Sequence, residues 1–127
     1  MKSLQSFLNP TRKPNLKFKL PAFEEEFEMR LLSAKEDLEV GNQARSNGET
    51  ETEAFIRCIA ESLVTPDLHN KELLDALSER EGRKIFDPVE ALKCIVTGAE
   101  LSALMKIFTD YANVTVDFGK KVDEIKN

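Results

Sequence analysis

The sequence predicts a mainly α fold of the α+β class, a compact helical domain of about five to six helices with a small N-terminal β-hairpin. Two observations lead to this prediction. Between residues 33 and 112, apolar residues recur at the i, i+3, i+4 spacing of one helical face, and helix-capping residues precede several of these runs. Closer to the N-terminus, two short segments alternate apolar and charged residues, which is the period of a half-buried strand.

The first element of the chain is an apolar helical turn over residues 3–8. It carries Leu4, Phe7 and Leu8, and Pro10 ends it. A turn of this length is only marginally stable by itself. It either packs on the domain or docks on a partner, and the sequence leaves both alternatives open. A basic patch follows, formed by Arg12, Lys13, Lys17 and Lys19.

Residues 16–20 and 27–31 are expected to form the two strands of the hairpin, with residues 21–26 as its loop. Because a lone hairpin is marginal in water, its apolar face should pack on the helices. The glutamates at 24–26 are expected to be solvated rather than to bind a metal ion. The apolar face consists of Leu16, Phe18, Leu20, Phe27, Met29 and Leu31.

Ser33 and Glu36 have the spacing of a capping box, so a helix should run over residues 34–45. Gly41 weakens its middle by about 1 kcal/mol relative to alanine. Its apolar face is thin, which predicts an outer helix, or one that becomes more buried in an assembly. The residues available for that face are Ala34, Leu38 and either Val40 or Ala44.

The most apolar helix begins after Thr50, which forms a capping pair with Glu53. It is expected to end at Thr65, because Pro66 disfavours helical geometry in the residue before it. Asn70 should then cap a second helix. The predicted core stripes are Phe55, Ile56, Ile59, Ala60, Leu63 and Val64 in the first helix and Leu73, Leu74 and Leu77 in the second.

Three further helices are predicted after Gly82, which suits the C-terminal end of the second helix. Asp87 caps a short helix with Pro88 at its first position, and Thr97 caps a long one. Asp117 is expected to cap a last helix. The apolar faces are Val89, Leu92, Ile95 and Val96, then Leu101, Leu104, Met105, Phe108 and Ala112, and finally Val122 and Ile125.

Length and composition favour one soluble domain over residues 1–127, with 1–15 as a terminal arm and 114–127 as a C-terminal tail helix. The 23 acidic residues outnumber the 18 basic ones, which gives a formal charge of −5 and no general attraction to nucleic acids or anionic membranes. The short apolar runs indicate neither an export signal nor a membrane span. Cys58 and Cys94 are expected to be free and buried.

No motif has the spacing of a catalytic or metal site. His69, the only histidine, lies in a predicted turn without a serine or cysteine motif beside it, which favours a structural or exposed role. Glycine-rich phosphate loops, paired CxxC motifs and HExxH are missing from the sequence. A DNA-reading helix-turn-helix over 87–112 is disfavoured, because the second helix has Lys106 as its only cation. We therefore expect no catalytic residue, cofactor, metal, nucleic acid or membrane partner.

The central turn resembles that of a known family. Residues 58–73 read CIAESLVTPDLHNKEL. They are similar to the central segment of the tail assembly chaperones of phages and prophages of Gram-positive bacteria, in which a helix ends in a Pro-Asp-Leu turn followed by Asn-x-x-Leu. Nearly the whole chain takes part in the resemblance, but Asn113-Val114 stands where an Asn-Gly turn is expected. The other similar segments are 6–10, 27–30, the helix start at 33–36, 87–104 and 122–127.

The resemblance implies a non-enzymatic chaperone of the host cytoplasm that is absent from the finished virion. Such a protein coats the tape measure protein and helps recruit the major tail tube protein. A helical tape measure protein exposes apolar stripes until the tube surrounds it, and a small protein with spare apolar faces can shield them. The alternative is a structural or adaptor component of a phage assembly, of the head–tail joining type.

Coating a long rod takes many copies, so we expect a homo-oligomer. The expected partner-binding residues lie on the terminal arm and on the weakly apolar helix. The basic patch of one copy would face the acidic residues 24–28 or 36–39 of the next, in a contact that weakens with salt. The partner-binding residues are Leu4, Phe7, Leu8 and Leu38.

Overall fold

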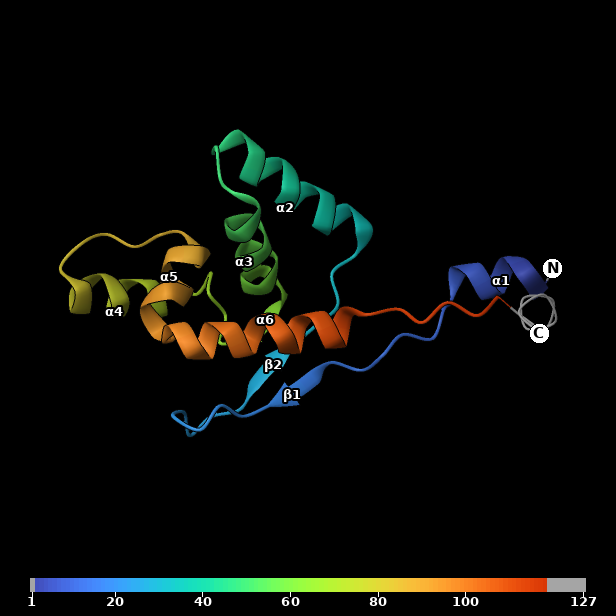
Figure 1. Ribbon diagram of the computed structural model, residues 1–127, viewed down its shortest axis with the longest axis horizontal. Coiled ribbons are helices and arrows are strands. Elements are labelled where there is room, and N and C mark those ends of the chain that lie inside the picture. The colour runs from blue at the N-terminus through green and yellow to red at the C-terminus, as the bar shows by residue number, and fades with distance from the viewer. Residues whose placement is uncertain (1, 119–127) are drawn as a thin grey trace.

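The computed structural model describes residues 2–118 (Figure 1). Within this range the chain forms six helices and one three-stranded antiparallel sheet, which confirms the predicted mainly α fold with a small sheet near the N-terminus. The elements in order are α1 (Lys2–Leu8), β1 (Leu16–Phe18), β2 (Phe27–Met29), α2 (Ala34–Ser46), α3 (Glu51–Ser62), β3 (Leu63–Thr65), α4 (Lys71–Glu81), α5 (Pro88–Ile95) and α6 (Gly98–Ala112).

Helix α3 is the central element, and it packs against α2, α5 and α6. Its start is as predicted, because the Thr50 side chain accepts a hydrogen bond from the Glu53 N–H at 3.1 Å. Its predicted end is wrong. The helix stops at Ser62, and residues 63–65 form strand β3 beside β2. The edge of β2 supplies backbone hydrogen-bond partners for residues 63–65. A helical turn that ended at Thr65 would instead be disfavoured by Pro66.

The predicted hairpin is confirmed, although both strands are shorter than expected. Strands β1 and β2 are antiparallel, with Leu16 opposite Met29 and Phe18 opposite Phe27. The rings of Phe18 and Phe27 stack at a centroid distance of 5.5 Å. With β3 added, β2 becomes the middle strand of the order β1-β2-β3.

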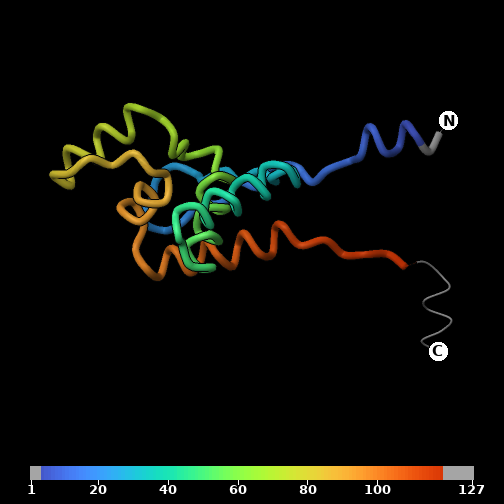
Figure 2. Tube along the Cα trace, turned by 90° about the horizontal axis from the view of Figure 1, so that it is seen from above, coloured from blue at the N-terminus to red at the C-terminus, as the bar shows by residue number. Residues whose placement is uncertain are grey.

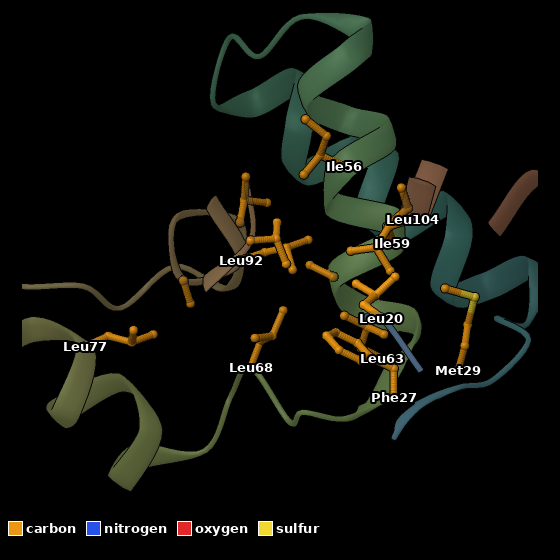
Figure 3. Packing of buried hydrophobic residues seen from close by; sticks show 14 of the residues in the cluster. Leu20, Phe27, Met29, Ile56, Ile59, Leu63, Leu68, Leu77, Leu92 and Leu104 are labelled. Carbon is orange, nitrogen blue, oxygen red and sulfur yellow. The ribbon is translucent and has the colours of Figure 1, made fainter. Parts of the chain in front are cut away.

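A single hydrophobic core joins the sheet to helices α3, α4, α5 and α6. Ile59 and Leu92 are fully buried, and Figure 3 shows them pointing toward each other from α3 and α5. Leu63 is buried as predicted, whereas Val64 is 39% exposed. The prediction for Val64 is wrong because neighbouring side chains of a strand point to opposite faces. Further buried core residues include Leu20, Phe27, Met29, Ile56, Leu68, Leu77 and Leu104.

Helix α2 has the predicted capping box at Ser33, but it turns a different face inward. Val40 and Ala44 are buried, and the helix packs on α3 through this side. Ala34 and Leu38 were expected on the apolar face and are exposed. Two residues correspond to about 200° of helical rotation, so Leu38 and Val40 point to nearly opposite sides.

The remaining helix starts follow the predicted caps. Asn70 accepts from the Leu73 N–H at 3.0 Å, and Gly82 ends α4 in the left-handed conformation with φ 71°. Asp87 caps α5 with Pro88 at the first position, and Thr97 forms a capping box with Glu100 at the start of α6. These boundaries depend on groups close in sequence, which explains why the sequence predicts them.

Residues 113–118 have no helical structure, so the predicted tail helix does not begin within them. Its expected apolar residues, Val122 and Ile125, lie outside the described residues. Cys58 and Cys94 are free as expected, but both are half-buried rather than buried. None of the helices within residues 2–118 is long and apolar enough to cross a membrane.

Candidate partner-binding surfaces

The N-terminal arm, residues 2–15, carries uncovered apolar side chains. Leu4, Phe7 and Leu8 are 57%, 84% and 63% exposed. Both Figure 1 and Figure 2 show α1 set apart from the helical body at the end of an extended stretch. Of the two alternatives that the sequence left open, packing on the domain or docking on a partner, the structure does not show the first. Docking on a partner stays a prediction.

The base of the arm is fastened to the C-terminal end of α6. The Lys13 ammonium donates hydrogen bonds to the carbonyl oxygens of Tyr111 and Asn113, each at 2.7 Å, and lies 5.9 Å from the centroid of the Tyr111 ring. The Tyr111 hydroxyl in turn donates to the carbonyl oxygen of Pro14 at 2.9 Å. A cation is favourable at these last carbonyls because the helix dipole is negative there. Lys13, one residue of the basic patch, is therefore engaged within its own chain.

Beside this anchor lies a groove of about 760 Å³, which we call the α2–α6 groove. One wall is the connection from β2 into α2, and the other is the C-terminal half of α6. The volume is within the range of about 300–1,000 Å³ that is typical of ligand pockets. Its apolar lining consists of Leu31, Leu32, Ala34, Phe108, Ala112 and Val114.

The α2 wall of the groove is held by an ion pair. Arg30 donates two hydrogen bonds to the Glu36 carboxylate, from Nη1 to Oε1 at 3.0 Å and from Nη2 to Oε2 at 2.8 Å. The Ser33 N–H donates to the same carboxylate at 2.9 Å. The hydrogen bonds from Arg30, and next those from Ser33, lower the pKa of Glu36 to about 2. Arg30 and Glu36 therefore form a neutralised pair at ordinary pH, while Arg12 and Asp37 also line the groove.

Leu38, the fourth predicted partner-binding residue, is 63% exposed. It lies on α2, whereas Leu4, Phe7 and Leu8 lie on α1, and the two helices are far apart in Figures 1 and 2. All four predicted residues are thus exposed, but the structure does not bring Leu38 together with the other three.

The residues after α6 form a second apolar surface that sequence reasoning missed. This tail segment, residues 113–118, carries Val114, Val116 and Phe118, which are 76%, 61% and 68% exposed. Their alternate spacing was the available signal, but a helix was expected to begin here. Figures 1 and 2 show that the tail segment leaves the body at the same end as the arm.

Arg57 is a buried cation that sequence reasoning did not identify. It is 1% exposed and donates hydrogen bonds to both Glu49 and Asp87. The two bonds to Asp87 are 2.8 Å long. Hydrogen bonding to Arg57 is the largest cause that lowers the pKa of Glu49 and the pKa of Asp87. The hydrogen bonds to Glu49, and next those to Asp87, raise the pKa of Arg57. Since each guanidinium nitrogen is engaged, this cluster joins elements rather than presenting a charge to a ligand.

His69 lies on the surface, with its Nε2 atom 2.9 Å from each carboxylate oxygen of Glu61. Its side chain is 59% exposed. Among the residues that the structure describes, no group of three or more His, Cys, Asp or Glu side chains could hold a metal ion.

Comparison of the chain with models of protein families, with curated proteins and with solved structures found no match.

Proposed function

We propose that this chain is a non-enzymatic phage tail assembly chaperone that binds and shields the tape measure protein and helps recruit tail tube subunits. It works in the host cytoplasm and leaves before the virion is complete. The proposal begins from the resemblance over nearly the whole chain. The structure supports it through the kind of surface that the fold leaves uncovered.

The observation that carries the proposal is a surplus of apolar side chains outside a complete core. Within the described residues, every buried side-chain nitrogen and oxygen has a hydrogen-bond partner, and the core residues are packed between helices α3, α4, α5 and α6 and the sheet. Among the residues that the structure describes, nine large apolar side chains remain exposed, and six of them lie on the arm and the tail segment. Apolar side chains gathered in this way mark interaction surfaces in soluble proteins.

The exposed side chains of the arm and the tail segment can bind the apolar face of a helix in the partner. Residues at i, i+3, i+4 spacing on a helix form a continuous apolar strip, and contact with such a strip provides affinity without any chemical step. The alternation of Val114, Val116 and Phe118 places all three on one side of an extended tail segment, which can lie along the strip. Burying one such side chain contributes about 1.5–3 kcal/mol, and several together offset part of the freedom that is lost on association.

Co-purification with the tape measure protein tests the proposal. We expect the full chain to bring down the tape measure protein, and the variant V116S/F118S to lose affinity by at least about tenfold, because each serine removes buried apolar surface. The matched control is Phe86→Ser, since Phe86 is also exposed, at 70%, but lies outside the arm and the tail segment. Failure of the full chain to bind, or an equal loss in the control, would overturn the proposal.

Mass spectrometry of purified virions separates this function from that of a structural or adaptor component. A chaperone should be present in lysates and missing from finished particles. A stoichiometric amount in virions would show the head–tail joining type of role instead.

A further inference from the structure

We propose that α1 of one copy docks in the α2–α6 groove of a second copy, so that the arm links copies of this chain. The inference concerns contacts within a homo-oligomer and does not require the tape measure protein. Its failure would therefore leave the proposed function standing.

Helix α1 needs a docking surface. It has seven residues, and helices shorter than about 12–15 residues are marginal in water without tertiary packing. Leu4, Phe7 and Leu8 have the i, i+3, i+4 spacing of one face, and all three are more than half exposed. The hydrogen bonds between Asn9 and Gln5 near its end are local: the Asn9 N–H donates to the Gln5 carbonyl at 2.9 Å, and Asn9 Nδ2 donates to Gln5 Oε1 at 3.1 Å. The helix is thus formed but has an uncovered apolar face.

The groove provides a surface of matching chemistry at the same end of the molecule. Its lining includes six apolar residues, and two of its four charged residues, Arg30 and Glu36, pair with each other. The other two are Arg12 and Asp37. Phe108 on its α6 wall packs edge-on against Phe55, with ring centroids 5.6 Å apart, so this wall is fixed to the core. A partly apolar groove of about 760 Å³ is large enough to take the side chains of one short helical face.

The anchor at Lys13 favours the groove of a second copy over that of the same chain. Residues 9–12 separate α1 from Lys13, and four residues span at most about 14 Å when extended. Arg12 already lines the groove, so α1 would have to reverse its direction within this span to enter its own groove. Pro10 opposes the reversal, because it fixes φ and keeps Asn9 out of helical geometry. The extended arm seen in Figures 1 and 2 carries α1 away from the helical body of its own chain.

Each copy then contributes one donor, α1, and one acceptor, the groove. Reciprocal exchange of arms closes a dimer, whereas one-way exchange builds a ring or an open helical array. In every case the contact pairs the same two surfaces, so it can be tested before the size of the assembly is known.

Complementation between two defective variants tests the contact. The arm variant L4S/F7S/L8S lacks the donor, and Ala112→Lys blocks the acceptor with a side chain that suits the last turn of a helix. In light scattering we expect the full chain to exceed the mass of a monomer, each variant alone to be monomeric, and an equimolar mixture to recover a 1:1 complex. Circular dichroism should show that both variants keep their helices, and Phe86→Ser should associate like the unchanged chain.

Site-directed cross-linking distinguishes the two copies. In a chain with Cys58→Ala and Cys94→Ala, one variant carries Phe7→Cys and another carries Ala112→Cys. A short bismaleimide should link them into a covalent heterodimer when they are mixed, and Phe7→Cys mixed with Phe86→Cys should stay largely unlinked. A full chain that is monomeric at high micromolar concentration would overturn the proposal. So would a chain carrying both Phe7→Cys and Ala112→Cys that cross-links only within itself.

Discussion

Arg57 holds together two acidic residues that lie 38 positions apart in the chain. Glu49 belongs to the loop before α3, and Asp87 is the cap of α5, whose Val89 N–H donates to it at 3.0 Å. The buried guanidinium therefore fixes the start of α5 against the side of α3. Burying the Arg57 cation costs solvation, and its hydrogen bonds to the two partly exposed carboxylates offset that cost.

We predict that Arg57→Met lowers the free energy of unfolding by about 3 kcal/mol, because it leaves Glu49 and Asp87 without their cation. Urea denaturation followed by circular dichroism measures this. The control is Arg83→Met, whose ion pair with Glu90 spans 3.9 Å between exposed side chains and should contribute less than about 1 kcal/mol. Similar small losses in both variants would show that the cluster around Arg57 is not a stabilising unit.

Replacing Ile59 by alanine should cost about 2–5 kcal/mol, because this fully buried side chain would leave a cavity between α3 and α5. The same denaturation measurement applies. Leu38→Ala, on the exposed side of α2, should stay within about 0.5 kcal/mol of the unchanged chain. A loss below about 1 kcal/mol for Ile59→Ala would place that face of α3 outside the core.

At the scale of elements, neighbours decide where helices end. Helix α3 stops at Ser62, whose carbonyl oxygen accepts from the Arg30 N–H at 2.9 Å, and the chain then pairs with β2. Helix α6 ends at Ala112, where the Lys13 ammonium donates hydrogen bonds to the carbonyl oxygens of Tyr111 and Asn113. In both cases a segment distant in the sequence supplies hydrogen bonds that the helix end itself lacks.

We predict that Lys13→Gln loosens the end of α6. Loss of the ammonium removes two hydrogen bonds and a favourable dipole interaction, so amide hydrogen exchange over residues 109–113 should become roughly fivefold faster, equivalent to about 1 kcal/mol. Lys19→Gln, in the same basic patch, is the matched control and should leave this exchange unchanged. Equal exchange in both variants would show that the arm is not anchored through Lys13.

At the scale of the whole molecule, three carboxylates have pKa values that folding lowers. They are Glu36, whose pKa falls to about 2, and Glu49 and Asp87 beside Arg57. In the unfolded chain such groups bind protons near their ordinary pKa values of about 4. As the pH falls through about 4, the unfolded state therefore binds more protons than the folded state. The free energy of unfolding decreases as the pH is lowered.

We accordingly expect the stabilisation from these carboxylates to be present in full at pH 6–7 and to be lost progressively below about pH 4.5. Urea denaturation at a series of pH values checks this. The pairing of Glu36 is partly exposed, so solvent screening weakens its share. Arg57→Met should have a shallower pH dependence, because Glu49 and Asp87 lose the main cause of their lowered pKa. An unchanged slope in this variant would contradict the assignment.

Two segments with uncovered apolar side chains leave the folded body at one end (Figure 2). Leu4, Phe7 and Leu8 were predicted from the sequence as partner-binding residues because they lie on a terminal arm outside any secure core. Their exposure agrees with that prediction, and their binding to a partner stays a prediction. The α2–α6 groove could not be predicted, because its walls come from residues 30–37 and 108–114.

The local features of this protein could be predicted from its sequence. Ser33, Thr50, Asn70, Asp87 and Thr97 mark the starts of five helices, because a capping side chain bonds to a backbone N–H only two or three residues away. Apolar spacing likewise identified most core residues of α3 and α5.

The features that join distant segments depend on tertiary contacts, so they could not be predicted from the sequence. The inward side of α2, strand β3, the partners of Arg57 and the anchor of the arm each depend on what lies across the fold. Leu38 and Val40 are equally apolar in the sequence, and the position of α3 determines that Val40 is buried. The physical reason is that packing and buried hydrogen bonds act between residues that are near in space. The spacing of residues along the sequence does not identify those neighbours.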